Sequence, residues 1–95
     1  MSHIKARIEA LRMLVDELKN AATIFERASL FAAIRILVED LDNDERLNSY
    51  AKEKANGVRW HCAAALGFDD TNGHTFEAHR GWAMGELSTL ESAYK

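Results

Sequence analysis

The sequence predicts a small all-α protein in which antiparallel helical hairpins form a bundle of about four helices, completed by self-association. The chain of 95 residues has no proline, and its first glycine is Gly57, so nothing strongly opposes helix formation in its first half. Apolar residues recur at alternating spacings of four and three from Ile4 to Phe25, and the stretch 29–41 is apolar on nearly every side if it is helical. A chain of this length forms one domain, residues 1–95.

The first helix is expected to cover residues 4–25. Every position of its inward repeat is apolar, as in a coiled coil or a helix of a bundle; the members are Ile4, Ile8, Leu11, Val15, Leu18, Ala22 and Phe25. Asn20 can end a helix, and Thr23 followed by Glu26 has the spacing of a capping box. We therefore expect a break near residues 20–23, with one long continuous helix as the alternative.

The second helix, expected at about residues 23–42, contains the most apolar stretch of the chain. A helix that is apolar nearly all round is a buried one, and a small chain cannot easily cover it with its own neighbours. We expect Leu30 and Ile36 to remain partly bare, and bare apolar patches usually mark interfaces. The sequence therefore predicts a homo-oligomer, most simply a twofold dimer, with Leu30 and Ile36 in the interface and Arg35 at its rim.

The third helix is expected at about residues 45–66. Asp42 or Asn43 is its predicted N-cap, because the acidic residues that follow favour the start of a helix. Gly67 is the predicted C-cap, and the pair 56–57 (Asn-Gly) is the alternative, earlier end.

The segment 67–75 is rich in turn-forming residues and is the clearest loop of the chain. The fourth helix follows at about residues 75–94. Gly81 and Gly85 lie four residues apart on one of its faces, and we expect them to let the third helix approach closely. The alternative is an α+β fold in which residues 34–38 and 58–62 form short strands, but two isolated strands would pair poorly.

Composition narrows the class of protein. The net charge of −3 at pH 7 argues against nucleic-acid binding, because nucleic-acid binders carry a basic surplus. Cys62 is the single cysteine, so no intramolecular disulfide can form, which fits a reducing compartment. The N-terminal segment lacks the apolar core of a signal peptide, and no apolar run approaches the roughly 20 residues that span a bilayer. We expect a soluble cytoplasmic protein with no membrane partner.

An aromatic and basic set is the most informative candidate site. In an antiparallel hairpin of the third and fourth helices, His61 is expected near Arg80 and Cys62 near His79. Tryptophan and arginine dominate the hot spots of protein interfaces, and neither tryptophan lies on the inward side of its helix. We predict a binding surface that consists of Arg59, Trp60, His61, His79, Arg80 and Trp82. The alternative is that both tryptophans only cover the flank of the bundle.

Other chemistries fit parts of the same region. The set could hold a nucleotide-like anion, with arginine at the phosphate and tryptophan on the base. His61, His74 and His79 lie near Cys62 in the sequence, but none of their spacings is a recognised zinc-ligand spacing. No sequence context activates the Cys62 thiol as a nucleophile. We therefore predict no enzymatic activity, no cofactor and no metal.

The leading hypothesis is a small non-enzymatic protein that acts by binding another protein of unknown identity. Short acidic chains without catalytic motifs are often accessory or inhibitory proteins, including phage-encoded ones, which is an association from size and composition. Binding or sequestering of a nucleotide-like anion is the second hypothesis, and a Cys/His metal-binding protein is the third.

Overall fold

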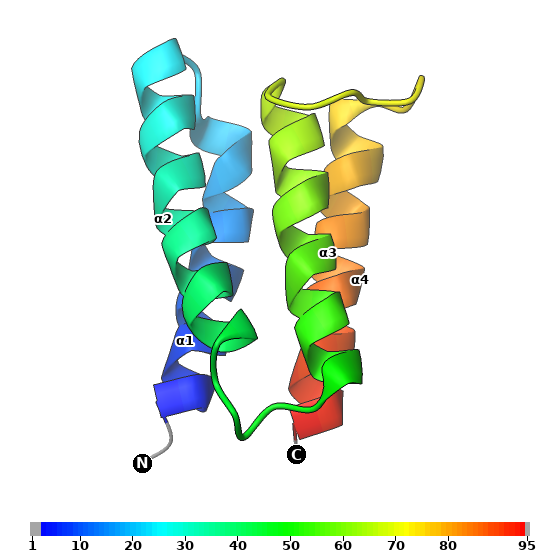
Figure 1. The fold of residues 1–95 in the computed structure, drawn as a ribbon. Coiled ribbons are helices and arrows are strands. Elements are labelled where there is room, and N and C mark those ends of the chain that lie inside the picture. The colour runs from blue at the N-terminus through cyan, green and yellow to red at the C-terminus, as the bar shows by residue number, and fades with distance from the viewer. Residues whose placement is uncertain (1–2, 95) are drawn as a thin grey trace.

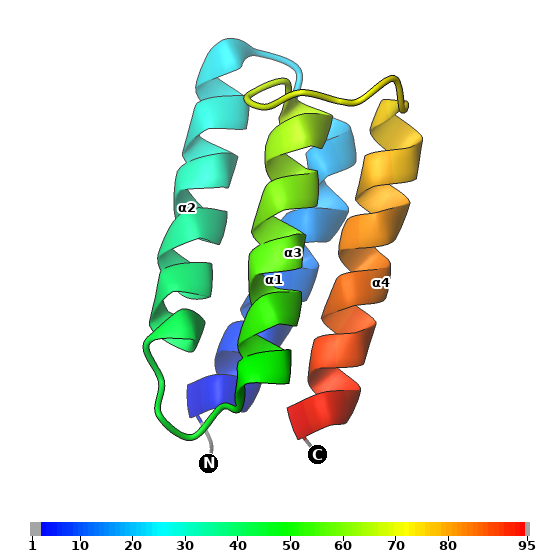
Figure 2. The same ribbon diagram turned by 45° about the vertical axis from the view of Figure 1, so that its right-hand side comes forward.

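The computed structural model describes residues 3–94, which form four α-helices and one short 3-10 turn and contain no strand. In chain order, these elements are α1 (His3–Glu17), η1 (Leu18–Asn20), α2 (Ile24–Asp42), α3 (Ser49–Leu66) and α4 (Phe76–Tyr94). The helices run alternately up and down, each beside its neighbours in the chain, and α1 packs against α4 to close the bundle (Figures 1 and 2). The predicted all-α bundle is confirmed. None of the helices in residues 3–94 has the length and apolar character needed to cross a membrane.

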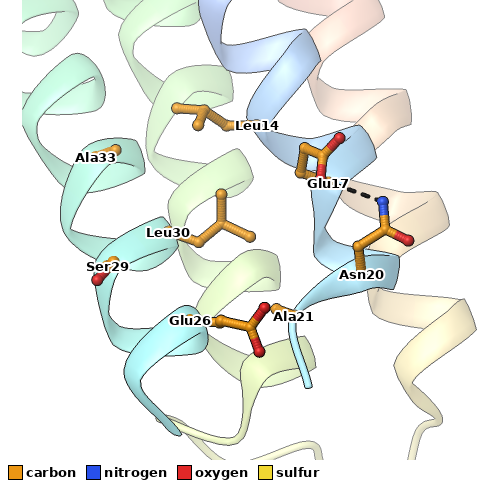
Figure 3. A pocket seen from close by; sticks show the side chains of 8 residues that line it. All are labelled: Leu14, Glu17, Asn20, Ala21, Glu26, Ser29, Leu30 and Ala33. Atoms are coloured by element: carbon orange, nitrogen blue, oxygen red, sulfur yellow. Dashed lines mark hydrogen bonds between the residues drawn. The ribbon is translucent and has the colours of Figure 1, made fainter. Parts of the chain in front are cut away.

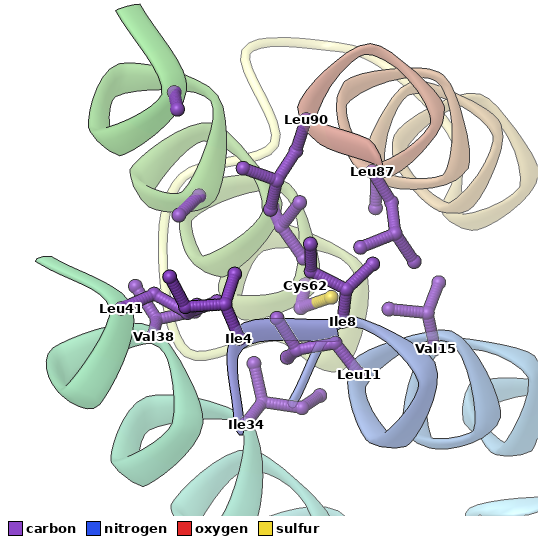
Figure 4. Close-up of a cluster of buried hydrophobic side chains, with 14 of the residues drawn as sticks. Ile4, Ile8, Leu11, Val15, Ile34, Val38, Leu41, Cys62, Leu87 and Leu90 are labelled. Carbon is purple, nitrogen blue, oxygen red and sulfur yellow. The ribbon is translucent and has the colours of Figure 1, made fainter. Parts of the chain in front are cut away.

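The hydrophobic core lies along the axis of the bundle and receives side chains from all four helices (Figure 4). Its labelled members are Ile4, Ile8, Leu11, Val15, Ile34, Val38, Leu41, Cys62, Leu87 and Leu90. The radius of gyration is 12.6 Å, close to the roughly 12 Å of a compact chain of this length. A single chain therefore covers the inward side of α2, including Ile34, Val38 and Leu41.

The predicted break between the first two helices is present. Thr23 caps α2: its Oγ1 accepts the backbone N–H of Glu26 at 3.1 Å, and the Glu26 carboxylate accepts the backbone N–H of Thr23 at 2.9 Å. Because the chain turns here, the last two members of the apolar repeat do not point inward. Ala22 is exposed, and the Phe25 side chain is 82% exposed.

The start of α3 differs from the prediction. Asn48 is the N-cap, and its side chain accepts a backbone N–H of the first turn at 2.8 Å, whereas Asn43 is the C-cap of α2. Between them, the Asp44 carboxylate accepts hydrogen bonds from the side chain and backbone of Arg46 and from Arg7 of α1, which hold its pKa well below the usual range. These contacts fix the acidic segment as a turn rather than as the first turn of a helix.

The end of α3 is as predicted. Gly67 adopts a left-handed conformation with φ of 88°, which favours glycine, and it ends the helix. The Asn-Gly pair at residues 56–57 stays helical, so α3 is one continuous helix. Thr75 then starts α4, where its Oγ1 accepts the backbone N–H of Ala78 at 3.1 Å.

Gly81 and Gly85 do not make the predicted contact with α3. Both lie on the exposed side of α4, and a Cβ atom added at either position would meet no other atom within 4 Å. The prediction was wrong because α4 turns its larger apolar residues to the core, which leaves both glycines outside. The close approach between these helices involves Gly57 of α3, where an added Cβ would lie 2.5 Å from Oε2 of Glu86.

Replacing Gly81 or Gly85 by alanine is expected to stabilise the protein. Glycine inside an exposed helix costs about 1 kcal/mol relative to alanine, which corresponds to a rise of about 4–8 °C in Tm for a domain of this size. Thermal unfolding followed by circular dichroism measures the change. Gly57→Ala is the control. Its Tm should rise less, because the added Cβ would force the Glu86 side chain to move. A lower Tm for Gly81→Ala would show that a neighbour covers this side of α4.

Candidate functional site

A pocket of about 340 Å³ is formed by α3, α4 and the loop that connects them. Trp60 of α3 and Trp82 of α4 line this pocket, and these residues are 38% and 43% exposed. We call this site the aromatic pocket; it is lined by Trp60, His61, Asn72, His74, His79, Trp82 and Glu86. Four of the six residues that the sequence predicted as a binding surface therefore lie together.

Helix geometry explains how these side chains meet. Trp60 and His61 follow each other on the outer side of α3, beside the core residue Cys62. His79 and Trp82 are three residues apart on α4, so they lie on one side of that helix. The antiparallel packing of α3 and α4 then brings the two pairs into contact.

A hydrogen-bonded histidine pair forms the inner part of the pocket. His79 is completely buried, its Nε2 lies 2.8 Å from the backbone oxygen of Thr71, and its Nδ1 lies 3.1 Å from Nδ1 of His61. A carbonyl oxygen can only accept a hydrogen bond, so Nε2 of His79 carries a proton. When both rings are neutral, Nδ1 of His61 donates to Nδ1 of His79, and Nε2 of His61 remains an acceptor.

The imidazole rings of this pair pack against both tryptophans. The His61 ring centroid lies 4.7 Å from that of Trp60 and 5.5 Å from that of Trp82, and the corresponding distances for His79 are 5.7 and 5.3 Å. His74 from the loop meets Trp82 edge to face at 4.8 Å. Contacts of this kind add to the stabilisation from burial, so the indole rings have a defined position.

The aromatic pocket contains one acidic side chain, Glu86, and a histidine that burial keeps neutral. Burial lowers the pKa of His61, and the adjacent His79 lowers it further, which outweighs the opposing effect of Glu86. The Glu86 carboxylate is the acidic group of the pocket. Its ion pair with Lys54 Nζ is long, at 3.7 Å, and no residue within 3–94 donates a hydrogen bond to it.

Both predicted arginines lie outside the aromatic pocket. Arg59 lines a different depression, between α2 and α3, together with Arg35 and Asp42. Arg80 points to α1, where its Nη2 donates to Oδ1 of Asp16 at 3.0 Å. The pocket therefore lacks the two cations that binding of a phosphate would use.

The predicted pairing of the hairpin was wrong by one residue. His61, expected near Arg80, is hydrogen-bonded to His79, and Cys62 belongs to the hydrophobic core. Burial raises the pKa of the Cys62 thiol to about 12, so the thiol is protonated and shielded at neutral pH. Within residues 3–94, no group of three or more His, Cys, Asp or Glu side chains is placed to hold a metal ion.

Three members of the pocket were left out of the predicted binding surface, and one of them, His74, was considered only as a candidate metal ligand beside His61 and His79. Glu86 follows Trp82 by four residues, and this spacing places it on the same side of α4, so a helical projection from the tryptophan could have found it. Asn72 and His74 reach the pocket through the conformation of the loop, for which the sequence carries no comparable periodicity.

The three residues predicted for the interface lie on different sides of α2. A groove of about 380 Å³ runs between α1 and α2, and Leu14 and Leu30 project into it (Figure 3). Ile36 lies on the outside of α2 and is 60% exposed. Arg35 lines the depression between α2 and α3, so it lies on the other side of α2 from Leu30.

No family model, curated protein or solved structure matches this chain.

The His61 environment predicts a pH-dependent stability. Because the pKa of His61 is lower in the folded state than in the unfolded chain, the unfolded chain binds protons more readily between the two values. The contribution of His61 is therefore fully present above the unfolded pKa of about 6.5 and is lost as the pH falls through the folded pKa. Denaturant unfolding at pH 7 and pH 5 should show a lower free energy of unfolding at pH 5.

The variant His61→Gln should reduce this difference between pH 7 and pH 5. His3→Gln is the matched control, because His3 is exposed at the start of α1, away from the pocket. An equal reduction in both variants would contradict the assignment to His61.

Proposed function

We propose that this chain is a non-enzymatic binding protein of the cytoplasm, of the accessory or inhibitory kind, that recognises another protein through the aromatic pocket. One observation supports this most strongly: two tryptophans, each about two-fifths exposed, are held by helices and by histidine contacts around one depression. Exposed tryptophans with defined positions are typical anchors of protein interfaces. They bury large areas and lose little conformational entropy on binding.

The geometry favours a protein partner over a nucleotide-like anion. Arg59 and Arg80 point to other parts of the bundle, and Glu86 places a negative charge in the pocket. A phosphate bound there would meet this carboxylate without a balancing arginine. The buried, protonated Cys62 thiol likewise offers no support for a nucleophilic enzyme.

Affinity capture with matched baits tests the proposal. The wild-type chain, the double variant Trp60→Ala/Trp82→Ala and the control Met13→Ala are immobilised, and the retained proteins are compared. Met13 is 72% exposed and lies on α1, outside the pocket, so its removal controls for general surface hydrophobicity. We expect a partner that the wild type and the control retain and the double variant loses. A partner retained equally by all three baits would contradict the proposal.

We also propose that two copies of the chain associate through the α1–α2 side of the bundle. Leu30, Ala33 and Ile36 are three residues apart, so they form an oblique row that leads from the groove to the outside of α2. Phe25 lies about three helical turns before Ile36, so both are on nearly the same side of α2, and at 82% it is the most exposed large apolar residue within 3–94. A hollow and a projecting aromatic side chain on one surface suit a twofold contact, in which each copy supplies both.

Replacing Ile36 by aspartate is expected to weaken this association by about 2 kcal/mol or more, roughly 30-fold in Kd, because a carboxylate would be buried in an apolar contact. Analytical ultracentrifugation measures the shift from dimer to monomer, and circular dichroism checks that the helices persist. Ile24→Asp is a close control, since Ile24 lies on the same helix and is 59% exposed compared with 60% for Ile36. A wild-type chain that sediments as a monomer at tens of micromolar would contradict self-association.

A further inference from the structure

Four side chains that line the aromatic pocket attract hydrogen-bond donors or cations: Trp60, Trp82, His61 and Glu86. The indole rings of Trp60 and Trp82 present electron-rich surfaces. Nε2 of neutral His61 is an acceptor, because its Nδ1 proton is used in the hydrogen bond to His79. The Glu86 carboxylate supplies the negative charge.

The Glu86 carboxylate is held in place but has unused hydrogen-bonding capacity. It lies over Gly57 of α3, where the missing Cβ leaves room for Oε2. The Glu86 side chain is 28% exposed, and its contact with Lys54 Nζ, at 3.7 Å, exceeds hydrogen-bond length. Within residues 3–94, this long ion pair is the only charged contact of the Glu86 carboxylate. An N–H donor that enters the pocket would therefore give the partly buried carboxylate a hydrogen bond that it lacks.

We propose that the aromatic pocket binds the guanidinium group of an arginine side chain that a partner protein presents. This inference rests on the proposed function and names the chemistry of the partner. A guanidinium is planar and can lie on an indole ring, while its five N–H groups can reach Glu86 and Nε2 of His61 together. A lysine ammonium has three donors at one point and no flat surface, so it uses fewer of these groups.

The surroundings of the pocket favour a basic partner. Asp69 and Asp70 are exposed in the connecting loop, close in sequence to the pocket residue Asn72, and Asp70 accepts the backbone N–H of Asn72 at 2.9 Å. The whole chain carries a net charge of −3. This charge attracts a basic surface over distances of about a Debye length. At about 340 Å³ the pocket is small among ligand sites, which suits one side chain.

Binding of small probes tests the inference directly. N-acetyl-arginine amide is titrated into the full chain, and tryptophan fluorescence follows binding at the pocket because the chain has two tryptophans and both line it. N-acetyl-citrulline amide has nearly the same shape but no charge. N-acetyl-lysine amide keeps the positive charge but lacks the planar guanidinium group. We expect saturable binding of the arginine probe, at least about fivefold weaker binding of the lysine probe, and no saturation with citrulline. Citrulline binding as tight as that of arginine would overturn the inference.

Variants of α3 and α4 provide a second test of the inference. Glu86→Gln should weaken binding of the arginine probe about tenfold or more, because the amide keeps the shape and loses the charge. Glu91→Gln removes the same charge from the same helix outside the pocket and should leave the affinity unchanged. Gly57→Ala should also weaken binding, since it displaces the Glu86 carboxylate without changing the net charge. Equal affinities of the wild type and Glu86→Gln would overturn the proposed role of the carboxylate.

The two proposals fail in different ways. If the arginine probe does not bind while Trp60→Ala/Trp82→Ala still loses a captured partner, the arginine inference is wrong and the proposed function stands. If the double variant retains every captured partner, the proposed function is wrong, whatever the probes show.

Discussion

The variant His79→Ala is expected to lose about 3 kcal/mol of unfolding free energy. The His79 side chain is completely buried, and its two ring nitrogens contact the backbone oxygen of Thr71 and the ring of His61. Truncation removes both contacts and leaves a cavity at the base of the pocket. Deletion of a large buried side chain costs about 2–5 kcal/mol, and leaving a buried hydrogen-bond partner unsatisfied costs about 1–3 kcal/mol.

Denaturant unfolding measures this loss, with His74→Ala as the matched control. His74 is exposed in the loop and packs its ring against Trp82 and His79, so its removal should cost less than about 1 kcal/mol. Amide hydrogen exchange should also accelerate in the loop 67–75 of His79→Ala, because the bond to Thr71 ties this loop to α4. Equal stabilities of the two variants would mean that His79 does not anchor the loop.

Replacing either Trp60 or Trp82 by alanine is expected to weaken binding of a captured partner by about 2 kcal/mol or more, roughly 30-fold in Kd. Both indoles line the aromatic pocket and are partly exposed, so the complex can bury the remainder of each. Because the indoles are partly exposed, each substitution should lower the free energy of unfolding by less than the roughly 3–5 kcal/mol that replacing a fully buried tryptophan costs.

Isothermal titration with the captured partner measures the affinity, and denaturant unfolding measures the stability of each variant. Met13→Ala again serves as the control, because it removes an exposed apolar side chain from α1. If the double variant Trp60→Ala/Trp82→Ala does not fold, the tryptophans are part of the core rather than a binding surface.

The periodicity of the sequence was sufficient to predict the helices, because a bundle needs an apolar residue at every turn that faces the axis. The capping box of Thr23 and Glu26 was also visible, since both partners are local in sequence. The start of α3 was placed too early, because Asp42, Asn43 and Asn48 are all suitable N-cap residues by type. The turn in which Asp44 accepts hydrogen bonds from Arg46 and Arg7 separates α2 from α3, so that Asn48 is the residue that caps α3.

The candidate site could be predicted only in part. Trp60 and Trp82 were recognised by residue type, and the hairpin geometry placed them near each other. Successive residues on a helix point about 100° apart, so a pairing that is shifted by one position directs a side chain to another neighbour. For this reason Arg80 was expected in the pocket but pairs with Asp16. Glu86 was missed for a different reason, because only aromatic and basic residue types were considered for the site.

The order of the helices around the bundle has a consequence for how the chain folds. Each helix packs against the next one in the sequence, and α3 and α4 share the most extensive of these contacts. Contacts between segments close in sequence require little loop closure, and helical bundles of this kind fold on the order of microseconds to milliseconds. On this basis we expect the α3–α4 hairpin to form early in folding. The aromatic pocket, which this hairpin alone builds, would then form before the bundle is complete.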